Sequence, residues 1–538
     1  MGKYVMILGA GLMQRPSIEA AMDLGYRTLV TDANPGALCA SFADVFEPVD
    51  LKDKEGLLSL AKSFGGELAG VFTAGTDFSA SVSYVAEGCS LPSHTYQAAL
   101  NASNKALMRA CFKSAGIPSP GYTRIFRSEL ASFMESHPLE SLPYPLVIKP
   151  VDNMGARGCR LVRTKEEFIP AAEDAMRASL SSCAILEEYM SGPEFSIDAI
   201  IYKGTFTVTG FADRHIFYEP YFIEMGHTIP TCADSGIRNE LIATFARAAH
   251  SLGLTCGAAK ADIKYTASGP MVGEIAARLS GGYMSGWTFP YSSGIDLTSQ
   301  AVLVATGNEP HELLLRRQPL PISGVPFPVY ELPSIRHSAE RALISIPGTV
   351  REIHGEERAT AYPYVRNYFP RVKQASRVDF PRNNVEKCGN IITFAASGSL
   401  ASESAEKSVS QIVLRLEPCD EATKNFLSGI QGRAEKDFPP DAYSAAREVT
   451  DYLMAADGSL GRDQKAASLL KDAPDYVSEW AKSARDWNHR TPMESLSLFD
   501  SICPVHPPVP LGDFWRALIR GGVQGILYTA DSLREGGD

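Results

Sequence analysis

The stretch from Lys260 to Gly282, KADIKYTASGPMVGEIAARLSGG, constrains the chain most, because it places two acids within one short β-hairpin. Residues 260–265 and 271–277 have the composition of strands, and TASGP between them is typical of a turn. In this hairpin Asp262 faces Glu274, and facing side chains have Cβ atoms about 5 Å apart. Two carboxylates at that spacing repel each other, so the pattern predicts a bound cation such as Mg²⁺, which prefers oxygen ligands.

This pairing assumes a turn that is symmetric about Ser268. Because side chains alternate along a strand, Glu274, Ala276 and Arg278 are expected to point to the same face. An ion pair of an acid with Arg278 on the hairpin surface is the simpler alternative. Signals upstream in the chain favour the metal site.

Size and composition limit the class of protein. A chain of 538 residues exceeds a single core, so about three or four domains are expected. The net charge of −11 argues against a general binder of nucleic acids or membrane surfaces. Ten scattered cysteines without a C-x-x-C pair favour reduced thiols and a cytoplasmic protein. The apolar start YVMILGAGLM is interpreted as a buried strand, and no apolar run has the roughly 18 residues of a membrane span.

Residues 1–100 have the pattern of a small doubly wound α/β unit. A strand ends at the turn Gly9-Ala10-Gly11, a helix follows, and a second strand ends at Asp32. Glycines followed about 20 residues later by an acid are also part of a dinucleotide fingerprint. The third glycine is absent, since Gln14 or Arg15 stands there. A dinucleotide-dependent oxidoreductase is therefore an alternative of another class.

Residues 101–162 carry the first phosphate signals. Lys105 lies in the first turn of a predicted helix over 101–115, where the helix dipole does not favour a cation. Lys149 closes an apolar strand, and the loop 152–158 after it contains two glycines and can expose backbone N–H groups to an anion. With a returning strand at 159–162, this predicts a hairpin whose tip is a lid over a polyphosphate.

The segment AILEEYMSGPEF changes from strand to linker and back to strand. Backbone groups at such a change can bind an adenine edge between apolar neighbours. Glu194 can accept hydrogen bonds from ribose hydroxyls. A solvated acidic doublet at Glu187 and Glu188 is the alternative.

Taken in order, these residues resemble the ATP-grasp superfamily of carboxylate–amine ligases. The N-terminal unit, with ILGAG and AGTD at 74–77, is similar to the pre-ATP-grasp domain of carbamoyl phosphate synthetase and biotin carboxylase, and EIAARLSGG resembles the L-amino-acid ligase branch. The resemblance covers residues 1–416. It implies an α/β and α+β multidomain fold with these parts: a doubly wound pre-ATP-grasp domain (1–100), an ATP-grasp domain (101–321) with a lid at about 122–190, a capping subdomain (322–416), and a mostly helical extension of unassigned role (417–538).

The resemblance also implies roles for individual residues. Lys105 and Lys149 would hold the α- and β-phosphates, and the loop with Asn153, Gly155 and Gly158 would close over the β- and γ-phosphates. The remaining roles are adenine binding by Glu187, Glu188, Tyr189 and Met190, ribose binding by Glu194, Mg²⁺ or Mn²⁺ binding by Asp262 and Glu274, and catalysis by Arg278 together with Lys149. One departure stands out: the usual pattern is Glu-x-Asn-x-Arg, and the Asn position is Ala276 here, which puts a second metal position in doubt.

The substrate residues are the least determined. EMGHTIP resembles a substrate-contacting stretch of amino-acid-ligase-like members, which points to Glu224 or His227. Gly281 and Gly282, with Arg278 before them, form a candidate pocket for an amino-acid carboxylate. The alternative is that these residues are structural.

The implied activity is an ATP- and Mg²⁺-dependent ligase that converts a small carboxylate to an acyl phosphate and joins it to an amine. Its partners would be small molecules, not nucleic acid or membrane, and a homo-oligomer is compatible with the sequence. Two alternatives stay open: an enzyme of purine-biosynthesis or carboxyphosphate type, and a catalytically silent nucleotide-binding module.

Overall fold

The computed structural model describes residues 2–429 and 437–535, which fall into two compact units. Unit 1 consists of Met1–His215, His227–Ala339 and Phe394–Gly398, and unit 2 of Ile216–Gly226, Glu340–Thr393 and Ser399–Asp538. Within the described part of the chain, no helix is both long and apolar enough to cross a bilayer.

Unit 1 begins with a four-stranded parallel sheet in the order β3-β2-β1-β4. Alternate residues of β1 enter two different cores: Val5 and Ile7 pack with α1, whereas Met6 and Leu8 pack with α2 and α3. The sheet is therefore covered on both faces, and the predicted doubly wound unit is confirmed. Its elements are β1 (Tyr4–Leu8), α1 (Arg15–Asp23), β2 (Arg27–Thr31), β3 (Val45–Glu47), α2 (Lys54–Ser63), β4 (Leu68–Phe72) and α3 (Ser79–Gly88).

The glycine turn after β1 is occupied by the protein's own side chains. Gln14 accepts a hydrogen bond from the Gly11 backbone N–H at 3.0 Å, and its side-chain amide donates to the Ala74 carbonyl. Asp32 accepts from the Ala10 backbone N–H at 3.0 Å. A Cβ atom on Gly9 would lie 3.0 Å from the Gln14 carboxamide carbon. The space in which a pyrophosphate would meet this turn is thus filled, which argues against dinucleotide binding there.

Two helices follow where the sequence predicted one. The predicted helix over 101–115 is wrong at its start, because α4 (Tyr96–Ser103) ends before Asn104 and α5 (Lys105–Ala115) begins after it. Asn104 has an extended backbone, and its side chain accepts hydrogen bonds from the Ala106 and Leu107 backbone N–H groups. This N-cap makes Lys105 the first residue of a new helix.

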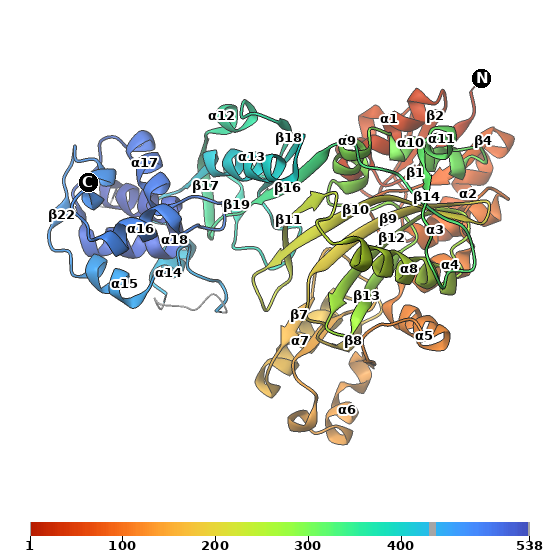
Figure 1. Ribbon diagram of the computed structural model, residues 1–538, viewed down its shortest axis with the longest axis horizontal. Coiled ribbons are helices and arrows are strands. Elements are labelled where there is room, and N and C mark those ends of the chain that lie inside the picture. The colour runs from red at the N-terminus through yellow and green to blue at the C-terminus, as the bar shows by residue number, and fades with distance from the viewer. Residues whose placement is uncertain (1, 430–436, 536–538) are drawn as a thin grey trace. The chain divides into compact units, whose positions relative to one another are not determined.

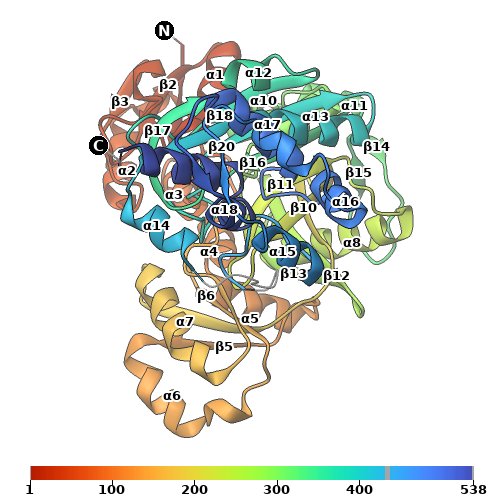
Figure 2. The ribbon, with the colours of Figure 1, turned by 90° about the vertical axis from the view of Figure 1, so that its left-hand side faces the viewer.

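A second sheet, antiparallel and in the order β5-β8-β6-β7, follows α5. The predicted hairpin around residues 152–158 is confirmed, with β6 paired to β7. Helix α7 packs on β6, β7 and β8, and α6 packs on β5 (Figure 2). The elements are β5 (Tyr122–Phe126), α6 (Leu130–Ser136), β6 (Leu146–Pro150), β7 (Arg160–Val162), α7 (Lys165–Ala178) and β8 (Cys183–Glu188).

The central feature of unit 1 is an antiparallel sheet with one apolar and one polar face. Its strands lie in the order β13-β12-β9-β10, with α8 against β12 and β13 (Figure 1). Phe195, Ile197, Ile263 and Ile275 point into the core under α8. The elements are β9 (Glu194–Tyr202), β10 (Thr205–Phe217), α8 (Ser235–Ser251), β12 (Gly257–Thr266), β13 (Gly269–Ala276), α9 (Phe289–Ser293), α10 (Leu297–Ala305), α11 (His311–Arg316), β14 (Gln318–Pro319) and β15 (Val329–Glu331).

The hairpin register brings the two predicted acids face to face. Asp262 pairs with Glu274, as predicted. The assumed symmetric turn about Ser268 is wrong, because Thr266 pairs with Gly269 across a two-residue turn. The register then shifts between Asp262 and Ile263, where Gly273 forms a β-bulge. The extra residue restores the pairing of the two acids.

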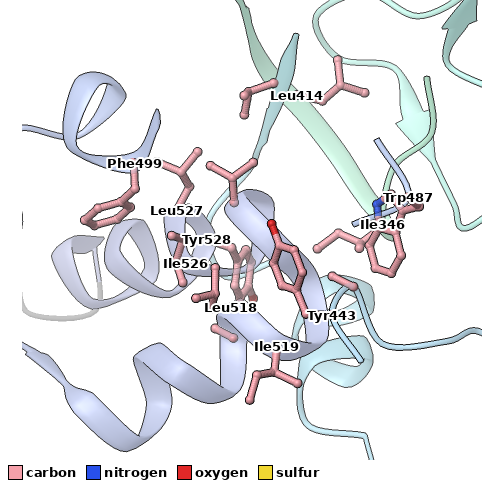
Figure 3. Close-up of a cluster of buried hydrophobic side chains, with 14 of the residues drawn as sticks. Ile346, Leu414, Tyr443, Trp487, Phe499, Leu518, Ile519, Ile526, Leu527 and Tyr528 are labelled. Carbon is pink, nitrogen blue, oxygen red and sulfur yellow. The ribbon is translucent and has the colours of Figure 1, made fainter. Parts of the chain in front are cut away.

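Unit 2 joins residues 340–393 to the C-terminal segment through one hydrophobic core. Ile346 and Leu414 share this core with Leu518 and Ile526 of α18 (Figure 3). Gln524 donates hydrogen bonds to the Ser345 hydroxyl and the Leu414 carbonyl, both at 2.8 Å. The predicted helical character of the extension is confirmed, while the domain boundaries of the sequence analysis stay predictions.

The strands and helices of this region, together with three strands that also contain unit 1 residues, have the following bounds: β11 (Ile223–Ile229), β16 (His337–Leu343), β17 (Gly348–His354), α12 (Glu356–Thr360), β18 (Val365–Pro370), β19 (Arg377–Val378), β20 (Gly389–Ala395), α13 (Gly398–Gln411), β21 (Val413–Leu416), α14 (Glu421–Leu427), α15 (Arg447–Met454), β22 (Ser459–Leu460), α16 (Asp475–Ser483), α17 (Pro492–Ile502), β23 (Val509–Pro510) and α18 (Leu511–Glu535).

Candidate nucleotide and metal site

The polar face of the central sheet of unit 1 gathers the charged residues that the sequence analysis selected. Asp262 pairs with Glu274 on β13 and with Ser196 on β9. Directly paired residues point to the same face of a sheet. By the same register this face also carries Lys260, Lys264, Glu194, Asp198, Arg214 and Ala276.

The two acids have cations as neighbours. The Asp262 carboxylate lies 3.0 Å from Arg214 Nη1 and also bonds the Lys260 ammonium. Glu274 Oε1 lies 3.4 Å from Lys105 Nζ. No group of three or more His, Cys, Asp or Glu side chains suited to a metal ion occurs among residues 2–429 and 437–535. Two facing carboxylates nevertheless fit Mg²⁺, which typically takes one or two protein carboxylates, phosphate oxygens and water.

Lys105 is buried at the start of α5, and the phosphate contact inferred from its unfavourable place in the helix dipole stays a prediction. Its ammonium donates to the Asn153 carbonyl at 2.9 Å, which ties α5 to the predicted lid loop. Burial alone would lower the pKa of Lys105, but the charges of Glu274 and Asp77 outweigh burial and raise that pKa above its usual value. The residue therefore keeps its positive charge in a buried place.

Glu187 and Lys149 meet in a buried ion triplet with Arg109. The Glu187 carboxylate lies 2.9 Å from Arg109 Nε and 2.8 Å from Lys149 Nζ. Burial would raise the pKa of Glu187, but Arg109 and Lys149 hold that pKa below its usual value. The Glu187 side chain thus positions Lys149, and adenine binding by residues 187–190 stays a prediction that rests on their backbone.

Sequence reasoning missed Arg109, which is fully buried. Its Nη2 also donates to the Gly273 carbonyl at 2.6 Å, so one side chain links the bulge of the β12–β13 hairpin to Glu187. The sequence did contain an indication that Arg109 lies near the site. Arg109 follows Lys105 by four residues, and residues at this spacing share one face of a helix.

The linker between β8 and β9 contacts the hairpin through Lys264. This ammonium donates to the Met190 carbonyl at 3.2 Å, lies 5.3 Å from the centre of the Tyr189 ring and approaches Glu194 at 3.6 Å. Glu194 also pairs with Arg214 at 2.6 Å. Glu188 is exposed and accepts from the Gly121 N–H. Among these residues, Tyr189, Met190 and Glu194 lie close to the polar face.

The predicted lid loop is fixed at its base by α7. The Asn153 side chain donates to the Ala178 carbonyl at 2.6 Å, and Asp152 accepts from residues 179–181. Gly155 and Gly158 have φ of 68° and 66°. A Cβ atom on Gly158 would lie 2.8 Å from that of Ala178, so glycine is required there.

Arg278 lies beyond the end of β13, so strand alternation does not determine its position. Its Nε and Nη2 atoms both donate to Asp77 Oδ1, at 3.1 and 2.7 Å. Gly75 and Gly281 allow this, because a Cβ on Gly281 would lie 3.3 Å from the Gly75 Cα. Burial alone would lower the pKa of Arg278. The negative charge of Asp77, with a smaller contribution from Glu274, outweighs burial and raises that pKa. The sequence indicated Asp77 only as part of the AGTD motif. It did not indicate that Asp77 binds Arg278.

A buried acid holds the loop that follows Arg278. Asp198 Oδ2 accepts from the backbone N–H and the hydroxyl of Ser280, at 3.0 and 2.7 Å. Burial raises the pKa of Asp198 to about 6, although the Ser280 bonds, Lys260 and Arg278 oppose this. Gly281 and Gly282 come next, and the Gly281 carbonyl accepts from the Met284 N–H at 3.1 Å.

The two substrate candidates on β11 belong to different units. His227, in unit 1, is buried with Nε2 2.7 Å from the Thr288 hydroxyl. Glu224, in unit 2, is buried, and its backbone N–H donates to the Asn384 side chain at 2.8 Å. The Lys387 ammonium donates to the Glu224 carbonyl at 2.9 Å. Their roles toward a substrate stay predictions.

Comparisons with known proteins show which domains the chain resembles. Residues 142–286 match the model of the ATP-grasp domain, and residues 341–417 match L-amino acid ligase C-terminal domain 2. An uncharacterized protein, y4rH, of Sinorhizobium fredii is 24% identical over 417 residues, which cover 75% of this chain and 81% of that protein.

Two further relatives extend the comparison. Carnosine synthase 1 of Homo sapiens is 24% identical over 333 residues, and the chain spans only 40% of its length. The crystal structure of L-amino acid ligase from Bacillus licheniformis superposes with a TM-score of 0.65 at 20% identity, covering 77% of this chain and 99% of that one. At that identity the superposition shows a shared fold. Residues 142–286 therefore belong to an ATP-grasp domain and residues 341–417 to an L-amino acid ligase C-terminal domain 2.

Proposed function

We propose that the chain is an ATP- and Mg²⁺-dependent carboxylate–amine ligase. It activates a small carboxylate, an amino acid, as an acyl phosphate, joins it to an amine, and releases ADP and phosphate. The observation that carries the proposal is the direct pairing of Asp262 with Glu274 beside Lys105. The domain matches and the similarity to carnosine synthase 1 and an L-amino acid ligase support the same reaction class.

Two lysines, Lys105 and Lys149, bind the phosphates. Lys105 and Lys149 neutralise phosphate charge, and each is already held by an acid, Glu274 and Glu187 respectively. Phosphoryl transfer depends mainly on such positioning and on charge neutralisation. The backbone of the loop with Asn153, Gly155 and Gly158 covers the terminal phosphates. Asp262 and Glu274 would hold Mg²⁺, or Mn²⁺ in its place, which would supply positive charge to the bound phosphates.

The activated carboxylate lies beside Arg278. The Arg278 guanidinium is held by Asp77 and stabilises the negative charge that develops on the transferred phosphoryl group. Because water would hydrolyse an acyl phosphate, closure of the lid at about residues 122–190 excludes it. In unit 1 the candidate substrate contacts are His227 and the Gly281–Gly282 loop, and in unit 2 the candidate is Glu224.

The test is incubation of the full chain with ATP, Mg²⁺ and pairs of amino acids. ADP and phosphate are the expected products, whereas AMP and pyrophosphate would reject the acyl-phosphate route. Glu274→Ala should abolish turnover, and Glu309→Ala, an exposed acid of the same unit, should not. ATP binding without turnover for any pair would instead favour a silent nucleotide-binding module.

A further inference from the structure

The substrate candidate Glu224 follows an aromatic loop that belongs to unit 2. The loop connects β10 to β11 and is rich in aromatic residues. Tyr218 and Tyr221 pack against the hydrophobic core of unit 2. Two half-buried tyrosines of a connecting loop therefore pack against the core of this unit.

The partners of these tyrosines come from two distant parts of the sequence. The Tyr218 ring meets Phe380 edge-on with centroids 5.3 Å apart, and Tyr221 meets Phe438 at 4.6 Å. Phe380 in turn contacts Phe438 at 5.5 Å and Trp487 at 5.1 Å. Phe438 and Trp487 belong to the extension 417–538, to which the sequence assigned no role. The loop tyrosines have one ring contact each in this five-ring cluster. Phe380 supplies the contact to Tyr218, and the extension supplies the contact to Tyr221 through Phe438.

The loop backbone has a conformation that its surroundings must hold. Tyr218 has φ of +66°, a left-handed value that is uncommon for a bulky side chain. Such residues persist where neighbouring contacts determine the conformation. Asp486 of the extension also lies close enough that its charge, after burial, raises the pKa of the Tyr218 phenol. The extension thus lies near both tyrosines, with Asp486 near the Tyr218 phenol and the Phe438 ring against Tyr221.

The other end of the loop is fixed by residues 384 and 387. Asn384 accepts from the Glu224 N–H and Lys387 donates to the Glu224 carbonyl, so both backbone groups of Glu224 are engaged. The rings hold the loop at residues 218–221, and these bonds hold it at residue 224. The Glu224 side chain is consequently presented from a backbone restrained on both sides.

We propose that the extension 417–538 positions the β10–β11 loop through Phe438 and Trp487, and thereby sets how Glu224 meets the amino-acid substrate. The positioning of the loop is independent of the reaction, whereas the effect on substrate rests on the proposed function. Phe438 and Trp487 are positioning residues, since Phe438 acts through Tyr221 and Trp487 acts through Phe380, which contacts Tyr218.

The first test measures the loop itself. Amide hydrogen exchange of peptides covering residues 216–226 is followed in the full chain for wild type, Phe438→Ala, Phe438→Tyr and Tyr452→Ala. Phe438→Ala should speed exchange there about tenfold, and Phe438→Tyr, which keeps the ring, should restore protection. Tyr452, an exposed aromatic of the extension whose ring meets Tyr476, is the matched control and should leave the peptides unchanged.

Unchanged exchange in Phe438→Ala would overturn the proposal. If Phe438→Ala exchanges faster throughout unit 2, Tyr221→Leu tests the same contact from the loop side. Faster exchange confined to residues 216–226 in that variant supports the proposal, and protection equal to wild type overturns it.

The second test separates substrate from nucleotide. In Phe438→Ala the KM for the amino acid should rise about tenfold while the KM for ATP stays within about twofold, a split that general destabilisation would not produce. Equal changes in both KM values would overturn the link to Glu224. If the wild type forms no amide bond at all, the proposed function fails, and hydrogen exchange still decides whether the extension holds the loop.

Discussion

Arg278 and Asp77 form an ion pair in which two guanidinium nitrogens donate to one carboxylate oxygen. The residues are 201 positions apart in the sequence. The pair joins the AGTD turn of the N-terminal sheet to the loop after β13. It fixes the guanidinium that the proposed reaction needs before any substrate binds, which reduces the reorganisation required in the transition state.

Asp77→Asn should therefore lower kcat more than it raises KM for ATP. A loss of about tenfold in kcat corresponds to about 1.4 kcal/mol of transition-state stabilisation. Steady-state kinetics with ADP detection measure both constants. Asp23→Asn, at an exposed acid of the same sheet domain, is the control. An unchanged kcat would show that Arg278 keeps its position without this partner.

Lys260→Met should tighten binding of the metal. The Lys260 ammonium bonds the Asp262 carboxylate, so a divalent ion must displace it or share that oxygen with it. Removal of the positive charge should lower the Kd for Mn²⁺ roughly tenfold, about 1.4 kcal/mol. Calorimetric titration of Mn²⁺ in the presence of a non-hydrolysable ATP analogue measures the change, with Lys62→Met as the exposed control. Weaker binding would mean that Lys260 organises Asp262 for the metal.

Arg109→Met should destabilise the protein strongly, because it leaves the buried Glu187 with Lys149 as its ion partner and removes the donor to Gly273. Breaking a buried pair typically costs about 3–5 kcal/mol. Denaturant unfolding measures the loss. Adding Glu187→Gln should recover part of it, since the buried carboxylate that has lost one of its two cations is then gone. A double variant no more stable than Arg109→Met would contradict this account.

The buried His94 predicts a pH dependence of stability. Its Nε2 lies 2.9 Å from the Ala258 carbonyl and its Nδ1 accepts from the Thr255 and Cys256 N–H groups, at the start of β12. Burial lowers the pKa of His94 from 6.5 to about 4. Between these values the unfolded chain binds the extra proton, so the contribution of His94 is present above pH 6.5 and is lost as pH falls toward 4. The loss approaches about 3 kcal/mol.

His94→Gln should flatten the wild-type decline between pH 6.5 and 4. Unfolding free energies of the apoprotein across this range give the comparison. A parallel decline in both proteins would assign the pH dependence to other groups.

Much of the fold and the polar face followed from local patterns. Strand composition and the turn residues TASGP predicted the hairpin with Asp262 and Glu274, and an apolar strand that ends at Lys149 predicted the hairpin around residues 152–158. The acid pairing was right although the turn was misplaced, because the bulge at Gly273 offset the error by one residue. The helix boundary failed because Asn104 was taken as part of a helix, whereas its side chain caps the next one.

The missed residues lacked any local pattern. Arg109 meets Glu187 over 78 positions and Asp77 meets Arg278 over 201, so only the tertiary fold brings each pair together. The proposed role of the extension could likewise not be predicted from the sequence. The contacts of Phe438 with Tyr221 and of Trp487 with Phe380 arise only in the folded chain.

The bulge at Gly273 has a consequence for changes of chain length. In a strand, one residue more or less inverts the facing of everything downstream. A bulge absorbs the extra residue, so deleting Gly273 would leave Val272 opposite Ile263 and Glu274 opposite Asp262 in a regular antiparallel pair. A deletion in the two-residue tip between Thr266 and Gly269 would instead force a new register and move Glu274 away from Asp262. The hairpin therefore accommodates loss of the bulged glycine better than a change of length at its tip.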